Sequence, residues 1–375
     1  MSTTEASQLP RPRTLFDKAL TVGVEEEFLL VDAVTGVVVP LAPDVLAADS
    51  PHDLQAELTQ FQVESATPVC RSMSEVRASL TTTRSVLGTM AAAHGTRIVA
   101  TGTPVLGDVK PVPLTNDPRY RRMEVEYGRL VQDLTICGCH VHVGIPDDDA
   151  GVLISNHLRP WLPVLLALSA NSPFADGRDT GYSSWRYLSW SPWPSAGAPP
   201  HFSSAEEYHV ARRNLLDSGA AMDPATVYWD VRLSANHPTV ELRVCDVAAT
   251  VDEAVLIAAL TRGVAVMALS ARAPALDVAP HVLRAAMWRA ARDGVEGTNV
   301  DLRTGSLVQA SKQVQALVEW VRPALEAAGD YDLVTDAADR ILLDGSGAAR
   351  QRRAFQQRGS LKDVVTLLMR QTAHP

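Results

Sequence analysis

The sequence predicts an α+β fold in which a mainly antiparallel sheet is flanked by helices. Segments rich in β-branched and aromatic residues come in hairpin-like pairs, with helical segments between them, which favours antiparallel over parallel strands. Several of these segments place acids, histidine or arginine at every second position. Because alternate residues of a strand face opposite sides, we expect one face of the sheet to be polar and concave.

Composition narrows the classes of partner. The 375 residues are 46% hydrophobic and 21% charged, which is typical of a globular protein, and the net charge of −9 argues against nucleic acid. Four cysteines, with no apolar leader before them, are typical of a cytoplasmic protein. The most apolar stretch, Ala254 to Ala271, carries Arg262 near its middle, so we expect a buried helix and no membrane partner.

The chain divides into a short tail and one folded domain. Residues 1–17 are polar and punctuated by proline, so we expect a flexible tail followed by a single domain over 18–375. Patterning predicts a turn and return strand at 33–39 and a long loop at 171–204. We expect strands at 21–32, 61–70, 98–105, 134–146, 226–233 and 239–244, and helices at 74–94, 117–131, 152–170 (with a kink at its prolines), 205–218 and 254–271.

The segment LTICGCHVHVGIP contains a motif that resembles a zinc site. As a strand, however, it sends His140 and His142 to one face and Cys137 and Cys139 to the other. The sequence therefore predicts no four-ligand zinc site here, and the cysteines should pack as small apolar residues. The histidines face something polar, or form a structural pair hydrogen-bonded to their neighbours.

The segment GVEEEF places two carboxylates on one face. Glu25 and Glu27 lie together, and Glu26 points the other way. Adjacent carboxylates repel each other unless a cation lies between them, and Mg²⁺ prefers oxygen ligands. A magnesium site is one interpretation, and a solvated strand end is the other.

Further acids and arginines follow the same pattern. Glu57 and Glu64 lie seven residues apart in the adjoining segment, and each alone is typical of a surface. An acid beside an arginine on an apolar strand forms either a structural ion pair or a ligand-binding pair, and a polar face is costly unless it binds something charged. Parity groups Glu241 with Arg243 and Cys245, and Asp230 with Arg232.

Five motifs in order carry a family resemblance: GVEEEF, CGCHVHVGIPD, NSPFADGRDTGYSSWR, VYWDVR and PTVELRVCD. From about Thr21 to near Leu368 the chain resembles the bacterial carboxylate–amine ligases of the type 2 glutamate–cysteine ligase family. The resemblance implies a glutamine-synthetase-like catalytic fold over 18–375. It also implies that ATP phosphorylates a carboxylate, usually the γ-carboxylate of glutamate, and that an amine attacks the acyl phosphate to give an amide, ADP and phosphate.

The resemblance also implies residue roles. Magnesium would be held by Glu25, Glu27, Glu57, Glu64 and Glu241. Catalytic roles would fall to Arg243, His142 and Arg186, and binding of ATP or substrate to Arg178, Tyr182, Arg232 and His140. Arg178, Tyr182 and Arg186 would form substrate contacts or a closing lid, or only stabilise the loop 171–204.

The resemblance sets the expected partners as well. These are a small-molecule acid, a small-molecule amine and a second copy of the chain in a homodimer. A weak glutamate–cysteine ligase activity is also compatible with the resemblance. Two alternatives stay open at the level of sequence. One is a metal-dependent hydrolase that uses His140 and His142, and the other is a homologue that binds nucleotide without turnover.

Overall fold

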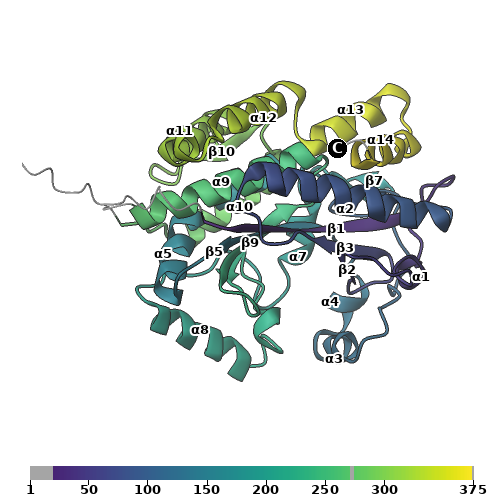
Figure 1. Cartoon of the computed structure of the whole chain (residues 1–375), viewed down its shortest axis with the longest axis horizontal. Helices are drawn as coiled ribbons and strands as arrows, with labels where there is room; N and C mark the ends of the chain where they lie inside the picture. Colours follow the sequence, from purple (N-terminus) through teal and green to yellow (C-terminus); the bar gives the residue numbers. More distant parts are fainter. Residues whose placement is uncertain (1–19, 271–273, 374–375) are drawn as a thin grey trace, which may run out of the picture.

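The computed structural model describes residues 20–270 and 274–373, so the predicted tail 1–17 lies outside the described part. Its centre is a seven-stranded sheet in which all pairings are antiparallel (Figure 1). The strand order is β2 (Asp53–Ala56), β3 (Gln62–Ala66), β1 (Val22–Asp32), β5 (Gly138–Gly144), β9 (Thr239–Asp246) and β8 (Val231–Leu233), and β4 (Thr96–Val99) pairs with the second half of β1.

One face of the sheet is covered by long helices. α2 (Met73–Ala93) and α9 (Val251–Ser270) pack on it, and α11 (Ala310–Ala328) and α12 (Tyr331–Asp344) form a further layer over α9 (Figure 1). Within the described residues, α9 alone is long and apolar enough to cross a membrane. Most of its side chains are buried among these neighbours, as expected for a core helix.

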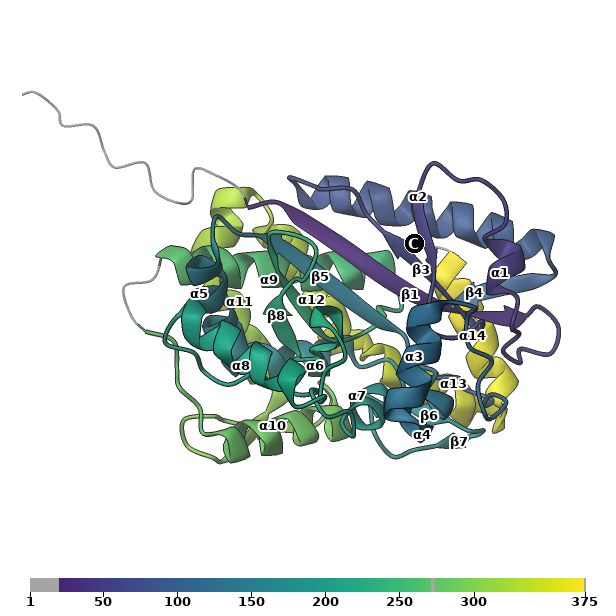
Figure 2. The ribbon, with the colours of Figure 1, turned by 90° about the horizontal axis from the view of Figure 1, so that it is seen from below.

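The remaining elements surround this core. α3 (Pro118–Tyr127), α4 (Arg129–Gln132) and α8 (Ala205–Asp217) lie on the other side of the sheet (Figures 1 and 2). The others are α1 (Ala42–Val45), α5 (Asp148–Leu158), α6 (Leu162–Ser169), α7 (Trp185–Trp190), α10 (Pro280–Asp293), α13 (Gly347–Arg358), α14 (Leu361–Ala373), the hairpin strands β6 (Phe174–Ala175) with β7 (Arg178–Asp179) and β10 (Thr298–Val300) with β11 (Leu307–Gln309), and 3₁₀ turns at Arg159–Trp161 and Pro224–Thr226.

Local predictions were mostly confirmed, with two corrections. The kink predicted in 152–170 is a 3₁₀ turn between α5 and α6. The predicted return strand at 33–39 is wrong, because only a single bridge joins Val31 to Val38. The loop 171–204 is not unbroken: it holds β6, β7 and α7, whose first turn is capped by the Ser184 side chain accepting from Tyr187 N.

A buried ion pair joins the sheet to α2. Glu26 faces the helices, where Arg84 donates from Nε to Oε2 at 2.9 Å and from Nη2 to Oε1 at 2.5 Å. Arg84 also donates to the carbonyls of Ala248 and Ala249, just before α9. Both side chains are fully buried and their polar atoms are paired. Removing one of them would therefore leave the other as an uncompensated charge inside the protein and destabilise the fold.

We therefore expect Glu26→Gln to destabilise the protein strongly. It leaves the Arg84 charge buried without a counter-charge, which costs about 3–5 kcal/mol in the free energy of unfolding. Urea unfolding measures this value, with Glu126→Gln on the exposed side of α3 as the control. A double change, Glu26→Leu with Arg84→Met, should recover much of the loss. Equal stability of the Glu26 and Glu126 variants would contradict the interpretation.

Candidate active site

Side chains of six strands meet in register on the face of the sheet away from α2 and α9. One cross-strand row contains Gln55, Glu64 and Glu27, and the next contains Glu25 and His140. A third row contains His142, Glu241 and Arg232. Directly opposed residues of antiparallel strands lie close enough to interact, so the register itself assembles the charged face.

A β-bulge in β9 corrects one prediction. Cys139 pairs with Cys245 and Val141 with Leu242, so two residues of β9, Arg243 and Val244, oppose the single His140. The extra residue reverses the parity of β9 beyond this point. Arg243 therefore lines the polar face with Glu241, whereas Cys245 lies in the core and not on their face as predicted.

The polar face opens into a cavity of about 710 Å³. It collects the charged strand residues and two residues of α7, Arg186 and Trp190, although their elements lie far apart in the sequence. All but two of the predicted site residues line it: Glu25, Glu27, Glu57, Glu64, His140, His142, Arg186, Arg232, Glu241 and Arg243.

The two exceptions lie outside the cavity. Arg178 is exposed in β7 and is absent from the cavity lining. Tyr182 contacts α10, where Trp288 Nε1 donates to its hydroxyl at 3.3 Å and the Arg292 guanidinium lies over its ring. The structure thus does not bring these two side chains to the cavity, and nothing in its geometry supports their predicted contact with cofactor.

One side of the cavity carries more cations than acids. The Glu241 carboxylate accepts from Arg232 Nε at 2.9 Å and also pairs with Arg243. Burial opposes ionisation of this carboxyl, but the two guanidinium groups outweigh it and hold its pKa well below the usual range. The two arginines therefore favour the ionised form of Glu241.

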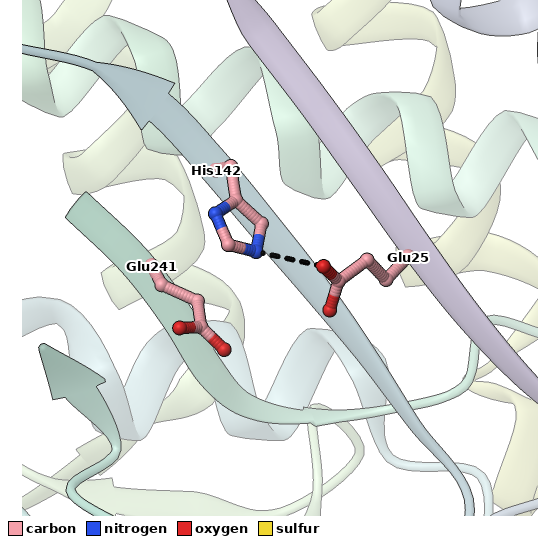
Figure 3. Close-up of side chains that lie close together, drawn as sticks. All are labelled: Glu25, His142 and Glu241. Carbon is pink, nitrogen blue, oxygen red and sulfur yellow. Dashed lines mark ion pairs between the residues drawn. The ribbon is translucent and has the colours of Figure 1, made fainter. Parts of the chain in front are cut away.

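Glu25 lies between the two histidines at the centre. His140 Nδ1 lies 3.1 Å from Glu25 Oε2, and His142 Nε2 lies 3.1 Å from Oε1 (Figure 3). Burial opposes ionisation of Glu25, but the hydrogen bonds and charges of both histidines lower its pKa strongly. Burial and the neighbouring Arg243 lower the pKa of His140 to about 4, which favours the neutral imidazole.

The other side of the cavity carries acids without matching cations. Burial and the Glu57 carboxylate raise the pKa of Glu27 to about 8, although Gly138 N donates to it at 2.6 Å. Burial, together with Glu57, Glu25 and Glu27, also raises the pKa of Glu64 well above its usual value. Crowded carboxylates with raised pKa values are typical of a cation site.

The arrangement of donors fits a divalent cation. In two sets of three side chains, one ligand atom from each lies within 4.8 Å of the others: Glu25, His142 and Glu241 (Figure 3), and Glu25, Glu64 and His140. The buried Nε2 of His140 also has no hydrogen-bond partner among the described residues. Two carboxylates with one imidazole suit Mg²⁺ or Mn²⁺.

Arg186 enters the cavity from α7. Its Nη1 and Nη2 donate to the carbonyls of Val244 and Arg243, both at 3.3 Å. A Cβ at Gly138 would overlap its guanidinium, so the glycine makes room for it. The resemblance implied a catalytic role for Arg186, as a substrate contact or part of a closing lid, or only a loop-stabilising one; its side chain is a buried part of the cavity wall.

An anchor behind Arg186 was missed from the sequence. The buried Asp246 carboxylate accepts from the Ser172 hydroxyl at 2.7 Å and the Ser184 hydroxyl at 2.8 Å, and Ser172 Oγ accepts from Arg186 N at 3.0 Å. Asp246 thereby fixes both ends of the 172–186 segment. The available signal was an acid at a core-facing strand position, which needs buried partners.

Comparison with known proteins agrees with this geometry. The model of glutamate-cysteine ligase family 2 matches residues 21–367. A Mycolicibacterium vanbaalenii protein with the provisional name glutamate–cysteine ligase 2-2 is 49% identical over 352 residues, covering 92% of this chain and 96% of that protein. A Saccharopolyspora erythraea protein with the provisional name glutamate–cysteine ligase 2-1 is 46% identical, covering 94% and 95%.

Solved structures share the fold at low sequence identity. A glutamate–cysteine ligase from Francisella tularensis in complex with AMP aligns with a TM-score of 0.71 at 13% identity, covering 95% of this chain and 88% of that one. A bifunctional glutathione synthetase from Pasteurella multocida aligns with a TM-score of 0.72 at 17% identity, and the chain spans 53% of its length. The predicted α+β, glutamine-synthetase-like fold is thus confirmed. The chain belongs to glutamate–cysteine ligase family 2 and is an ATP-dependent ligase that joins a carboxylate to an amine.

Proposed function

We propose that the cavity joins glutamate, or a similar small amino acid, to an amine through an acyl phosphate, with Mg²⁺ at the carboxylates. The observation that carries this proposal is the meeting of two cation sets with Arg243 and Arg186 in one cavity. Phosphoryl transfer depends mostly on positioning and charge neutralisation, which such an arrangement can supply.

The proposed reaction has two steps. A substrate carboxylate oxygen attacks the γ-phosphorus of ATP, the bond from that phosphorus to the β–γ bridging oxygen breaks, and ADP leaves. The amine nitrogen then attacks the carbonyl carbon of the acyl phosphate, and the carbon–oxygen bond breaks as phosphate leaves. The proton lost by the amine goes to a nearby carboxylate or to the phosphate.

The residues of the cavity divide this work. Arg243 and Arg186, which line the cavity, would stabilise the phosphoryl group in transfer or hold the acid substrate, and His142 with Arg232 would contact the phosphates. Glu25, Glu27, Glu57, Glu64 and Glu241 are the proposed cation ligands, with His140 oriented by Glu25. Bound cations would neutralise the phosphate charge.

The hydrolase alternative has less support. Each cation set has one histidine and two carboxylates, and the family to which the chain belongs is a ligase family. A hydrolytic centre built on His140 and His142 would use both imidazoles on one ion, but they belong to different sets.

We expect magnesium-dependent ADP release with a subset of acid–amine pairs, and loss of this activity in Glu25→Gln. The change removes the one carboxylate that both cation sets share, so the rate should fall by about 10²–10³-fold or more. ADP release and new amides are measured by coupled assay and mass spectrometry, with the exposed Glu206→Gln in α8 as control. Absence of ADP with every pair, together with metal-dependent amide hydrolysis, would reject the ligase.

Divalent cation binding should release protons at pH 7. Burial and the Glu57 carboxylate raise the pKa of Glu27 to about 8, so it holds its proton at pH 7, and a cation nearby favours the ionised form. The affinity for the divalent cation should therefore rise as the pH approaches 8 and level off above it. Calorimetry with Mg²⁺ and Mn²⁺ in two buffers of different ionisation enthalpy measures the proton count, which Glu27→Gln should reduce. Equal heats in both buffers would contradict the assignment.

Gly138→Ala should displace Arg186 and leave the fold intact. The added Cβ meets only the flexible end of the arginine and, at 3.1 Å, His140 Nε2, so the guanidinium can move aside. A shift of about 1 Å in a positioning group can lower the rate by 10–100-fold. Gly88→Ala in α2, where an added Cβ meets nothing within 4 Å, is the control. Unchanged kcat in Gly138→Ala at unchanged Tm would remove Arg186 from the proposed machinery.

A further inference from the structure

One end of the cavity is walled by aromatic rings that the phosphoryl chemistry does not use. Trp190, Trp193 and Tyr228 line it, and their ring centroids lie 4.5–5.3 Å apart in tilted and edge contacts. Tyr120 and Met123 of α3 complete this aromatic end. Trp190 is only half-buried, so its ring remains open to a ligand.

The aromatic end has an unused hydrogen-bond donor. Trp193 is 2% exposed, lines the cavity, and its indole N–H has no acceptor among the described residues. Buried donors are nearly always paired in a functional state, because an unpaired one costs about 1–3 kcal/mol. A mainly apolar ligand that carries one acceptor would satisfy both the rings and this donor.

The charges near the aromatic end indicate whether it binds the amine or the nucleotide. Leu58, which lines it, directly follows Glu57, and Ile136 lies two residues before Gly138, whose N–H binds Glu27. The aromatic end thus adjoins the acids that lack matching cations. Two arginines also border the aromatic end, but each already has a carboxylate partner. Arg119, over the Tyr120 ring, pairs with Asp223, and Arg232, which donates to the Val227 carbonyl beside Tyr228, pairs with Glu241. The arginines paired with Glu241 lie across the sheet from these acids, in β8 and β9. A polyphosphate prefers that cationic side, whereas an ammonium is attracted to carboxylates and to ring faces.

We propose that the aromatic end binds the side chain of the amine substrate, and that the preferred amine carries a flat, mainly apolar group with one hydrogen-bond acceptor. This inference rests on the ligase function proposed above. It predicts a preference for an aryl amine such as tyramine over the small thiol amino acid cysteine. The side chain of cysteine is small, so a pocket that binds it would not need the three rings of Trp190, Trp193 and Tyr228.

The test measures ADP release with four amines in the presence of ATP, Mg²⁺ and glutamate or another accepted acid. Hydroxylamine needs no side-chain pocket and reports acyl-phosphate formation as a hydroxamate. Tyramine and 2-phenylethylamine report the aromatic end, and cysteine is the small competitor. In Trp190→Ala, kcat/KM for tyramine should fall by about tenfold or more, while the hydroxylamine rate changes less than about twofold. The exposed Trp288→Ala in α10 is the matched control.

The outcomes separate this inference from the ligase function. Hydroxamate formation with no preference for aryl amines over cysteine would overturn the inference and leave the ligase function standing. A higher KM for ATP in Trp190→Ala, with the amine preference unchanged, would place the adenine at the aromatic end and also overturn it. No ADP or hydroxamate with any acid would reject the ligase function and the inference together. Tyr228→Leu, judged by the same ratio of rates, serves if Trp190→Ala does not fold.

Discussion

The period-two alternation of the sheet is the constraint on which the rest of the molecule depends. Each strand must present an apolar side to α2 and α9 and a charged side to the cavity, and a slip of one residue would exchange the two. Glu25 and Glu27 with Glu26 between them illustrate the requirement. The acid on the wrong side is accommodated only because Arg84 meets it with a bidentate pair inside the core.

The charge on the cavity face is unevenly distributed between its two sides. Glu241 and Glu25 are ionised, because arginines stabilise the first and histidines the second, whereas Glu27 and Glu64 crowd together and hold protons more tightly. Such crowding costs stability in the free protein. The same crowding makes binding of a divalent cation more favourable, because the cation relieves the repulsion. In the proposed function, this asymmetry would favour a polyanion on one side of the cavity and an ammonium on the other.

Parity explains how far the sequence could predict this site. It separated the histidines from the cysteines in β5 and Glu25 and Glu27 from Glu26, because an unbroken strand obeys a simple period. Parity gave the wrong face for Cys245, because the β-bulge adds one residue to β9 and the residue pattern of β9 does not indicate it. Arg178 and Tyr182 were grouped with Arg186 by motif alone, yet only Arg186 of the three lines the cavity. The aromatic end brings together α3, α7 and a loop before β8. Contacts between segments so far apart in the sequence produce no local periodicity, so the sequence did not predict this end of the cavity.

Gly138 shows how the parts are joined at one backbone position. Its N–H binds Glu27, its missing side chain admits the Arg186 guanidinium, and its neighbour in the same strand is the core-facing Cys139. Asp246 pairs with Gly138 across the sheet and anchors the segment that carries Arg186. A proposed cation ligand, a cationic side chain and the anchor of that side chain thus meet at a single cross-strand pair. Geometry here is set by the rigid sheet rather than by the loop, which is the condition under which charges can be positioned before substrates arrive.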